Sequence, residues 1–445
     1  MTDFDAEVTA GADGRPLHVR LLRLLRDEGA VSRAELGDRL QMPRPRLLAE
    51  LERLVSLGYV AEAGLAASRG GRRSTLVELS PHLRFAAVDL GASSIDVEVV
   101  NGRLETVAAY TEAADIRSGP KVTLQRVNEL LHKAEVDGAY ERLDAVGIGV
   151  PGPVSFRDGV PVSPPIMPGW DRFPVRELLT REHGCPAVVD NDVNIMAIGE
   201  RHGGVAHSVD DFLFIKIGTG IGCGIYLHGE VYRGTDGCAG DIGHIQVDPN
   251  GPMCSCGNLG CLEAVFSGAA LPGGDRGGPH RGVAGAGRTA GRPGRGDRAG
   301  RGAGGDRGDV TCIQLIRDGG RRVGSVLAGL VSFTNPSMIV IGGGLAQLGH
   351  ILLAEIRSVV YRRSLPLATG NLPVVLSELG PRAGVAGAAV LASDLASGGS
   401  MTGKPLVEAP ADAVAGRGGP APHRRRHKVP GGTRARRRAT GGAGR

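Results

Sequence analysis

The stretch Phe85–Ala–Ala–Val–Asp–Leu–Gly–Ala–Ser93 decides the fold class. Its first residues form a short apolar run, which is typical of a buried strand, and the Asp–Leu–Gly sequence that ends the run indicates a polar turn. Further strand-like runs follow at 95–100, 106–109 and 144–150, and a helical pattern covers 121–134. Strands that alternate with helices along this part of the chain predict an α/β architecture.

The segment before this strand has the pattern of a DNA-binding domain. Helical spacing is present at 17–28, a capping-box sequence at 32–35 begins a second short helix, and a third helix is expected at 44–57. Two strand-like runs on either side of a basic turn follow before residue 80. Helix, helix, turn, helix and hairpin in this order predict a winged helix-turn-helix domain at residues 15–80.

Six side chains of this domain are candidates for contacts with DNA. Arginine near the exposed N-terminal end of a recognition helix can contact phosphate or a guanine edge, and a basic wing can reach the backbone or the minor groove. From Arg15 to Thr75 the chain has 12 arginines and 7 acidic residues, so the segment is locally basic. The alternative is that these charges form an ordinary solvated face. The candidates are Arg44, Arg46 and Glu50 in the third helix and Arg69, Arg72 and Arg73 in the turn.

The composition favours a protein of the cytoplasm. The chain has no uninterrupted apolar run of about 18 residues, and its N-terminus is acidic and lacks an apolar core, so neither a membrane span nor a secretory signal is expected. Seven cysteines, three of them within eight residues, suit a reducing cytoplasm and a bound metal better than a disulfide framework.

Two segments, 271–310 and 401–445, differ from the rest of the chain. They are rich in glycine and arginine and together hold 19 basic and 6 acidic residues, so the overall net charge of +5 leaves −8 for the remainder. Such a composition, without apolar spacing, cannot form a packed helix. One hypothesis is that both segments are out-of-frame translations of a GC-rich gene. The alternative is a native disordered insert, with a disordered basic tail at 396–445.

The strongest local signal is Cys254–Ser–Cys–Gly–Asn–Leu–Gly–Cys261, which follows Asp241–Ile–Gly–His244. Three thiolates and one imidazole form a ligand set that zinc prefers in tetrahedral sites, and the two glycines let the backbone turn so that the sulfurs converge. Four protein ligands leave no open position, so the zinc is expected to be structural. The alternative is a cluster of buried free cysteines. The expected ligands are His244, Cys254, Cys256 and Cys261.

Three glycine-containing turns follow predicted strands. Glycine lets backbone N–H groups approach a phosphate, and a hydroxyl or a carboxylate that holds a metal completes the site. One such turn is weak evidence because glycine turns after strands are common, but three in one α/β chain favour a nucleotide site. Their residues are Asp89, Gly91 and Ser93, then Gly218, Thr219 and Gly220, and finally Gly342, Gly343 and Gly344.

A run of acids and amides, Asp190–Asn191–Asp192, stands at the end of the apolar strand 187–189. Open α/β sheets bind ligands at such strand ends. Asp192 can take a proton from a hydroxyl group if Asn191 orients that group. The alternative is an Asn/Asp turn that only caps the helix at 193–200.

Together these motifs resemble the ROK family of repressors and sugar kinases, and the resemblance covers residues 15–270 and 311–393. The most specific part is the pair DIGH at 241–244 and CSCGNLGCLE at 254–263. The resemblance implies an actin-like, ribonuclease-H-like ATPase fold with lobes at 84–200 and 201–395 and a substrate cleft between them. It also implies a structural Zn²⁺, and ATP and Mg²⁺ where kinase chemistry is retained.

The resemblance also implies a role for each motif. The glycine turns become nucleotide contacts, and two loops, Pro151–Gly–Pro153 and Pro168–Gly–Trp170, flank the sugar pocket. The chain departs from the kinase pattern at Asp241, where Glu is usual, and at Ser93, where Thr is commoner. The implied sugar contacts are Asn191, Asp192, Asp241, His244 and Glu263, with Asp192 in the catalytic-base position.

Members of the family that begin with a winged helix resemble sugar-responsive regulators. The sequence therefore predicts a homo-oligomeric repressor, a dimer or tetramer, that acts on carbohydrate-metabolism genes. Its partners would be operator DNA and a sugar or sugar phosphate. The alternative is a glucokinase-like, ATP-dependent sugar kinase in which Asp192 deprotonates a hexose hydroxyl.

Overall fold

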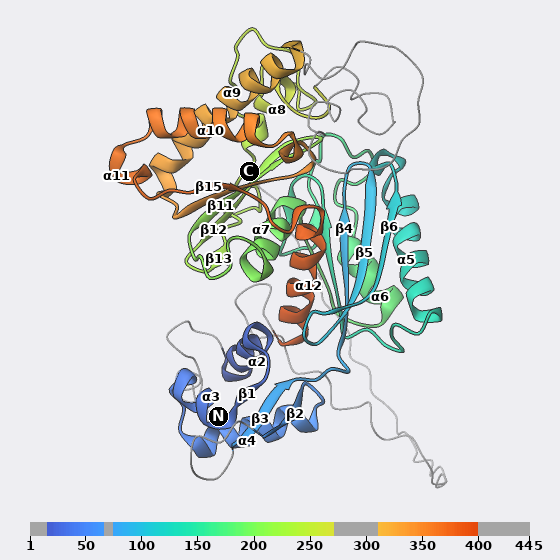
Figure 1. Cartoon of the computed structure of the whole chain (residues 1–445). Helices are drawn as coiled ribbons and strands as arrows, with labels where there is room; N and C mark the ends of the chain where they lie inside the picture. Colours follow the sequence, from blue (N-terminus) through green and yellow to red (C-terminus); the bar gives the residue numbers. More distant parts are fainter. Residues whose placement is uncertain (1–15, 66–73, 271–309, 399–445) are drawn as a thin grey trace, which may run out of the picture. The chain divides into compact units, whose positions relative to one another are not determined.

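The computed structural model describes residues 16–65, 74–270 and 310–398, with side chains of the last segment described from residue 313 (Figure 1). Segments 271–309 and 399–445, on which the out-of-frame hypothesis and the predicted basic tail rest, therefore lie outside the described residues. Among the residues that are described, no helix is long and apolar enough to cross a lipid bilayer.

The N-terminal domain has the helices and strands that the sequence predicts. Ser32 caps α3 because its hydroxyl oxygen accepts a hydrogen bond from the backbone N–H of Glu35 at 3.2 Å. Leucines from all three helices pack with Val60, Val77 and Leu79 in one small core. The elements are α2 (Leu17–Glu28), β1 (Val31–Ser32), α3 (Arg33–Leu40), α4 (Arg44–Ser56), β2 (Val60–Leu65) and β3 (Thr75–Leu79), with sheet order β1-β3-β2.

The first lobe is built on a five-stranded sheet with the order β10-β7-β4-β5-β6. Strands β4, β5 and β6 form antiparallel pairs, and β7 and β10 extend the sheet in parallel. Helices α5 (Pro120–Val136) and α6 (Val175–His183) cover one face. The strands are β4 (Arg84–Leu90), β5 (Ser94–Asn101), β6 (Thr106–Ala113), β7 (Ala145–Val150) and β10 (Ala187–Asn191).

The second lobe repeats this arrangement with the order β15-β14-β11-β12-β13. Strands β11, β12 and β13 are antiparallel, and β14 and β15 are parallel to β11. Helices α8 (Leu262–Val265), α9 (Val310–Thr334) and α10 (His350–Arg363) pack on its outer face (Figure 1). The strands are β11 (Phe212–Ile217), β12 (Ile221–Leu227), β13 (Glu230–Val231), β14 (Met338–Gly342) and β15 (Val374–Leu376).

Two helices, α7 (Asp192–Gly203) and α12 (Ala383–Ala396), share one apolar core with the inner faces of both sheets. They approach each other so closely that a Cβ atom on Gly199 would overlap the carbonyl of Ala383, and one on Gly387 would overlap the carbonyl of Ile195. Only glycine fits at these two positions. The last helix of the segment predicted as the second lobe therefore packs on the sheet of the first lobe.

The predicted fold class, an α/β body behind a winged helix-turn-helix, is confirmed. Short elements complete the fold. They are η1 (Ile116–Ser118), β8 (Val154–Ser155), β9 (Val160–Pro161), η2 (Ile242–His244), η4 (Gly344–Leu348), α11 (Pro366–Thr369) and η5 (Gly380–Arg382).

Candidate functional site

A cavity of about 850 Å³, called the cleft here, opens between the ends of the two sheets. All the residues that the sequence predicts as sugar or nucleotide contacts line it, from both lobes and from η2, η4 and α8. They are Asp89, Gly91, Ser93, Asn191, Asp192, Gly218, Thr219, Gly220, Asp241, His244, Glu263, Gly342, Gly343 and Gly344.

The first-lobe side of the cleft is the hairpin between β4 and β5. Asp89 lies on the face of β4 that turns toward α12, because its neighbours Val88 and Leu90 belong to the opposite core. Its side chain is packed so tightly that a Cβ atom on Gly384 would overlap its carboxylate. Burial is the main reason that the pKa of Asp89 is raised to about 7; Asp192 and Asp96 raise it further, and Lys216 lowers it.

The second-lobe side contains the other two glycine turns. The backbone N–H of Gly218 donates to the carbonyl of Gly220 at 2.9 Å and closes the β11–β12 hairpin. Gly343 has a φ of 85°, and a Cβ atom there would lie 2.6 Å from the carbonyl oxygen of Ile217, so this position between β14 and η4 requires glycine. Both turns thus bring backbone close to the cleft.

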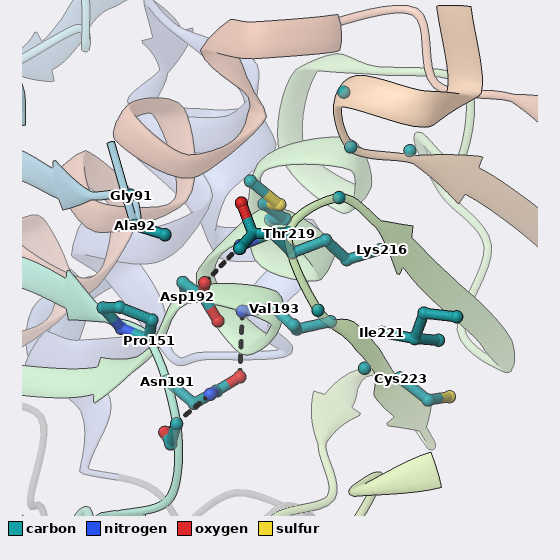
Figure 2. A pocket seen from close by; sticks show the side chains of 18 of the residues that line it. Gly91, Ala92, Pro151, Asn191, Asp192, Val193, Lys216, Thr219, Ile221 and Cys223 are labelled. Atoms are coloured by element: carbon teal, nitrogen blue, oxygen red, sulfur yellow. Dashed lines mark hydrogen bonds and ion pairs between the residues drawn. The ribbon is translucent and has the colours of Figure 1, made fainter. Parts of the chain in front are cut away.

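Asn191 and Asp192 stand where β10 ends and α7 begins (Figure 2). Asn191 is the N-cap of α7: its side-chain oxygen accepts from the N–H groups of Val193 and Asn194 at 2.8 and 3.3 Å, and its amide donates to the carbonyl of Gly152 at 2.8 Å. Asn191 therefore has the helix-capping role that is the alternative interpretation of the Asp190–Asp192 run. Asp192, 3% exposed, points into the cleft from the first turn of the helix.

The charged partner of Asp192 is Lys216, which sequence reasoning missed. The ammonium of Lys216 forms an ion pair with Oδ2 of Asp192, and the side chains are 18% and 4% exposed. Two nearby acids, Asp192 and Asp89, outweigh the effect of burial and raise the pKa of Lys216. The available signal was a single lysine in the apolar strand Phe–Leu–Phe–Ile–Lys–Ile, because a strand lysine between core residues needs a partner.

Three residues of the second lobe join the cleft to the cysteine cluster. His244 lies between them: its Nε2 is 3.9 Å from Oδ1 of Asp241, and its Nδ1 is 3.7 Å from Oε1 of Glu263. Glu263 follows Cys261 in the chain by two residues, at the start of α8. Nε2 of His244 thus faces the carboxylate of Asp241, while Nδ1 faces both the carboxylate of Glu263 and the thiol of Cys254.

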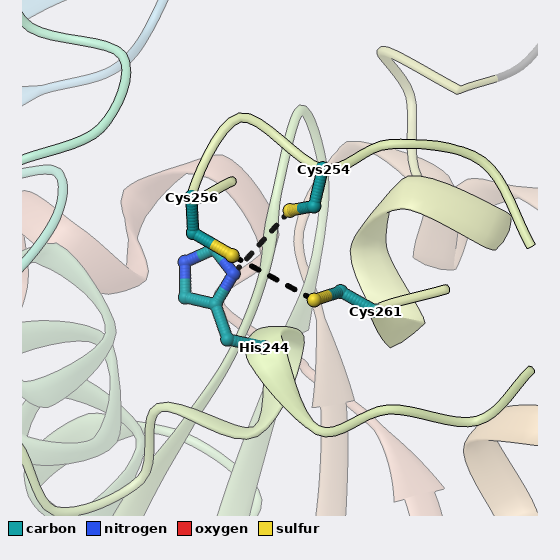
Figure 3. A group of neighbouring side chains, drawn as sticks. All are labelled: His244, Cys254, Cys256 and Cys261. Carbon is teal, nitrogen blue, oxygen red and sulfur yellow. Dashed lines mark hydrogen bonds between the residues drawn. The ribbon is translucent and has the colours of Figure 1, made fainter. Parts of the chain in front are cut away.

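The candidate ligand atoms of His244, Cys254, Cys256 and Cys261 lie within 4.8 Å of one another (Figure 3). The Sγ atoms of Cys256 and Cys261 are 3.7 Å apart, and Sγ of Cys254 is 3.5 Å from Nδ1 of His244. Ordinary Zn–S and Zn–N bonds in a tetrahedron give edges of about 3.8 and 3.6 Å, so the group fits zinc. The backbone N–H of Asn258 is the main cause that lowers the pKa of Cys256 to about 7, whereas burial is the main cause that raises the pKa of Cys254 and of Cys261. Thiolate is the form that binds metal.

The structure describes only the predicted DNA contacts that lie in α4. Arg44 is exposed at the start of α4, Arg46 is partly buried, and Glu50 pairs with Arg53 at 2.6 Å. Arg69, Arg72 and Arg73 lie outside the described residues.

The two predicted loops differ in how they meet the cleft. Pro151, Gly152 and Pro153 line it, whereas Trp170 is fully buried in the core of the first lobe and donates its indole N–H to the carbonyl of Ile116 at 3.2 Å. Trp170 therefore has a packing role, since a large aromatic ring gains by filling the core, whereas Pro168 and Gly169 are exposed and the preceding Pro165 and Ile166 line the cleft.

Comparison with known proteins gives the class of this two-lobed fold: its solved relatives are regulators and sugar kinases. Residues 85–395, well over half of the chain, match the model of the ROK family, and the chain belongs to this family.

The relatives of the chain include two regulators and a sugar kinase. The xylose repressor of Caldicellulosiruptor bescii is 28% identical over 383 residues, which is 85% of this chain and 95% of that protein. A ROK family transcriptional regulator, described as a homolog of the E. coli MLC protein, has a TM-score of 0.68 at 25% identity and covers 87% of this chain and 97% of its own. A ROK family glucokinase from Streptomyces griseus, in complex with glucose and AMPPNP, has a TM-score of 0.58 at 27% identity and covers 69% and 99%.

Proposed function

We propose that this protein is a sugar-responsive, DNA-binding transcriptional regulator that acts as a repressor of carbohydrate-metabolism genes. The observation that supports this most directly is how far the similarity extends. The part from Phe85 to the C-terminus is only about 81% of the chain, so matches that cover 85% and 87% must include residues of the winged helix domain. The glucokinase match covers 69%.

The charge of the cleft supports an uncharged sugar as the effector. Its lining includes five carboxylates, those of Asp89, Asp96, Asp192, Asp241 and Glu263, and one lysine. A sugar phosphate adds further negative charge to this surface, and like charges in a partly buried site repel. A neutral sugar instead donates hydroxyl hydrogen bonds to carboxylate oxygens.

The proposal is tested with the full chain and duplex DNA selected from a random pool. Operator affinity is measured by fluorescence anisotropy at fixed salt, during titration with neutral hexoses and pentoses and with their phosphates. We expect one neutral sugar to weaken operator binding by at least about fivefold, and its own affinity to fall by the same factor when DNA is bound. If no sugar or sugar phosphate changes the affinity for the selected DNA, the regulator proposal is wrong.

DNA binding itself has a matched pair of variants. Arg44→Ala removes an exposed cation at the start of α4. It is expected to weaken binding by about 1–3 kcal/mol if it contacts a base, or to reduce the salt dependence if it contacts phosphate. Arg181→Ala removes an exposed arginine from α6, far along the chain from the winged helix, and is expected to leave DNA binding unchanged.

The cysteine cluster supports a structural Zn²⁺. Because helix-turn-helix regulators commonly bind two-fold DNA sites as dimers, we also propose a homo-oligomer, which light scattering of the full chain would test. ATP-dependent sugar phosphorylation is the second candidate, since the base-position Asp192 and the glycine turns are kept. A coupled assay of ADP release over common hexoses, with Asp192→Asn as the control, separates the two. Sugar-dependent turnover that Asp192→Asn abolishes would favour the kinase.

A further inference from the structure

Lys216 places a positive charge beside the two buried carboxylates of the cleft. Phosphoryl transfer needs a divalent cation to neutralise the charge of the nucleotide, and carboxylates at the cleft hold that cation. In this cleft the two buried carboxylates are Asp89, 6% exposed, and Asp192, 3% exposed. The ammonium of Lys216 is paired with the second and interacts electrostatically with the first.

The backbone fixes this position for Lys216. It lies on the face of β11 opposite to Ile215 and Ile217, which belong to the outer core of the second lobe. Its strand neighbour across β14 is Gly342, where a Cβ atom would overlap the ring of Phe214. Because β11 is hydrogen-bonded to β12 on one side and to β14 on the other, the side chain of Lys216 extends toward the cleft.

The charges around Lys216 keep it an ammonium. Burial lowers the pKa of the lysine, but Asp192 and Asp89 raise it by more, so the net direction is upward. A metal ion at the same place would have to displace the ammonium of Lys216 or bind beside it, and two neighbouring positive charges repel each other. A sugar hydroxyl that approaches Asp192 must also compete with Lys216 for Oδ2.

The residues of the cleft therefore do not fit nucleotide-bound Mg²⁺. We propose that Lys216 is a built-in cation that takes the place of the divalent metal ion, so that the cleft binds its sugar without nucleotide and senses it without phosphorylating it. This inference rests on the proposed regulator function and names the residue that separates sensing from catalysis.

The first part of the test uses the wild-type chain, with Mn²⁺ and a non-hydrolysable ATP analogue as probes. Binding of Mn²⁺–nucleotide is followed by electron paramagnetic resonance, and sugar binding by thermal shift with and without the probe. We expect the sugar to raise the melting temperature to the same extent in both conditions. We also expect Mn²⁺–nucleotide binding to be absent up to millimolar concentration. Tight Mn²⁺–nucleotide binding by the wild-type protein would overturn the proposal, whatever the variants do.

The second part changes the cation. Lys216→Met keeps the length of the side chain and removes its charge, and it should strengthen Mn²⁺–nucleotide binding by at least about tenfold. Lys216→Arg keeps the charge and should behave as the wild type. If the Lys216→Arg protein gains metal binding equal to that of Lys216→Met, side-chain packing rather than charge is responsible and the proposal is wrong.

Operator binding and its response to sugar are measured on the same preparations. If sugar fails to release DNA while the metal results hold, the regulator function is wrong and the role of Lys216 stands. If sugar releases DNA but the wild-type chain binds Mn²⁺–nucleotide, the reverse applies. The two failures are thus distinguishable.

Discussion

The two lobes have the same strand order but present opposite charges at the same position. Asp89 is the penultimate residue of β4 and faces Gly149 in the parallel strand β7. Lys216 is the penultimate residue of β11 and faces Gly342 in the parallel strand β14. Each precedes a tight hairpin that lines the cleft, so one backbone arrangement supports a carboxyl group in the first lobe and an ammonium group in the second.

The difference lies in how each charge is satisfied. The ammonium of Lys216 is paired with Asp192, which α7 brings from the first lobe. Oδ1 of Asp89 is buried and has no hydrogen-bond partner among the described residues. A second difference is the Cys/His cluster, which belongs to the second lobe. The first lobe is therefore expected to depend on packing, and the second on packing, a metal and an ion pair.

The largest expected effect comes from loss of the metal. Zinc binding to such a ligand set contributes to folding directly, so we expect chelation, or Cys254→Ser, to destabilise the second lobe by on the order of 5 kcal/mol. The melting temperature should fall by roughly 10 °C or more. Calorimetry with and without chelator measures it. Cys238→Ser, an exposed thiol of the same lobe outside the cluster, is the control and should leave the chelator response unchanged. An equal loss of both lobes' stability would contradict the contrast drawn here.

The next effect concerns the ion pair. Lys216→Met leaves the nearly buried Asp192 without its cation, and breaking such a pair costs about 3–5 kcal/mol. The matched control is Lys133→Met: Lys133 pairs with Asp137 at 2.6 Å on the surface of α5, with both side chains at least half exposed, and such pairs contribute about 0–1 kcal/mol. Urea unfolding measures both variants. Adding Asp192→Asn to Lys216→Met should restore part of the loss; additive losses would mean that the pair is not coupled.

Much of this contrast could be predicted from sequence. The apolar runs, the capping box at Ser32 and the cysteine spacing each depend on local chemistry, so they identify the strands, the winged helix and the candidate metal ligands, which lie together in the structure. The glycine turns and the acidic strand end mark the cleft for the same reason, and all of them line one cavity.

What sequence reasoning missed depends on contacts between distant residues. Lys216 in β11 and Asp192 in α7 are 24 positions apart in the sequence. Helix α12 returns to the first lobe from the far end of the described chain. Trp170 could not be assigned to the core rather than the pocket because a Pro–Gly–Trp loop fits both. Tertiary packing, which the local pattern does not contain, decided each case.

A smaller effect is expected at the other half of the comparison. The pKa of Asp89 is about 7 in the folded chain, above its ordinary value of 3.8, so the folded state keeps a proton that the unfolded chain releases. Lys216, Asp192 and Asp96 are the charged groups that act on it. This contribution to stability is complete at acid pH and is lost as the pH rises through about 7. Asp89→Asn removes the titration.

We therefore expect Asp89→Asn to gain stability relative to the wild type as the pH is raised from 5 to 8, by about 1–2 kcal/mol. Urea midpoints across this range measure the difference. Asp158→Asn is the control: Asp158 does not act on Asp89, and the hydrogen bond from the Ser155 hydroxyl at 2.6 Å lowers the pKa of Asp158, so it stays ionised from pH 5 to 8. A constant difference between Asp89→Asn and the wild type at all pH values would show that Asp89 stays ionised.

The smallest expected effect tests how the first lobe communicates with the winged helix. Helix α12 touches Asp89 through Gly384 near its start, and near its end Asp394 binds Arg23 at 2.7 Å and also pairs with Arg26, both in α2. Another helix, α7, lines the cleft with its first turn and has His202 in its last turn, where Nδ1 of His202 is 3.5 Å from Oδ1 of Asp27 in α2. The first turn of α7 thus lines the cleft and α12 contacts the cleft residue Asp89, and both helices contact α2 near their other ends.

Asp394→Asn weakens this contact by about 1 kcal/mol because Arg26 keeps its bond to Asp27 at 2.8 Å. A loss of that size should reduce the sugar-induced change in operator affinity by about fivefold while leaving sugar binding itself unchanged, since Asp394 is not at the cleft. Asp318→Asn, which removes an exposed acid from α9 in the second lobe, should have no effect on this ratio. Because binding coupling is reciprocal, the same fivefold reduction must appear in the effect of DNA on sugar affinity. If Asp394→Asn leaves both ratios unchanged, the signal does not pass through α12, and the lobes would differ only in the charges at the cleft and in the Cys/His cluster.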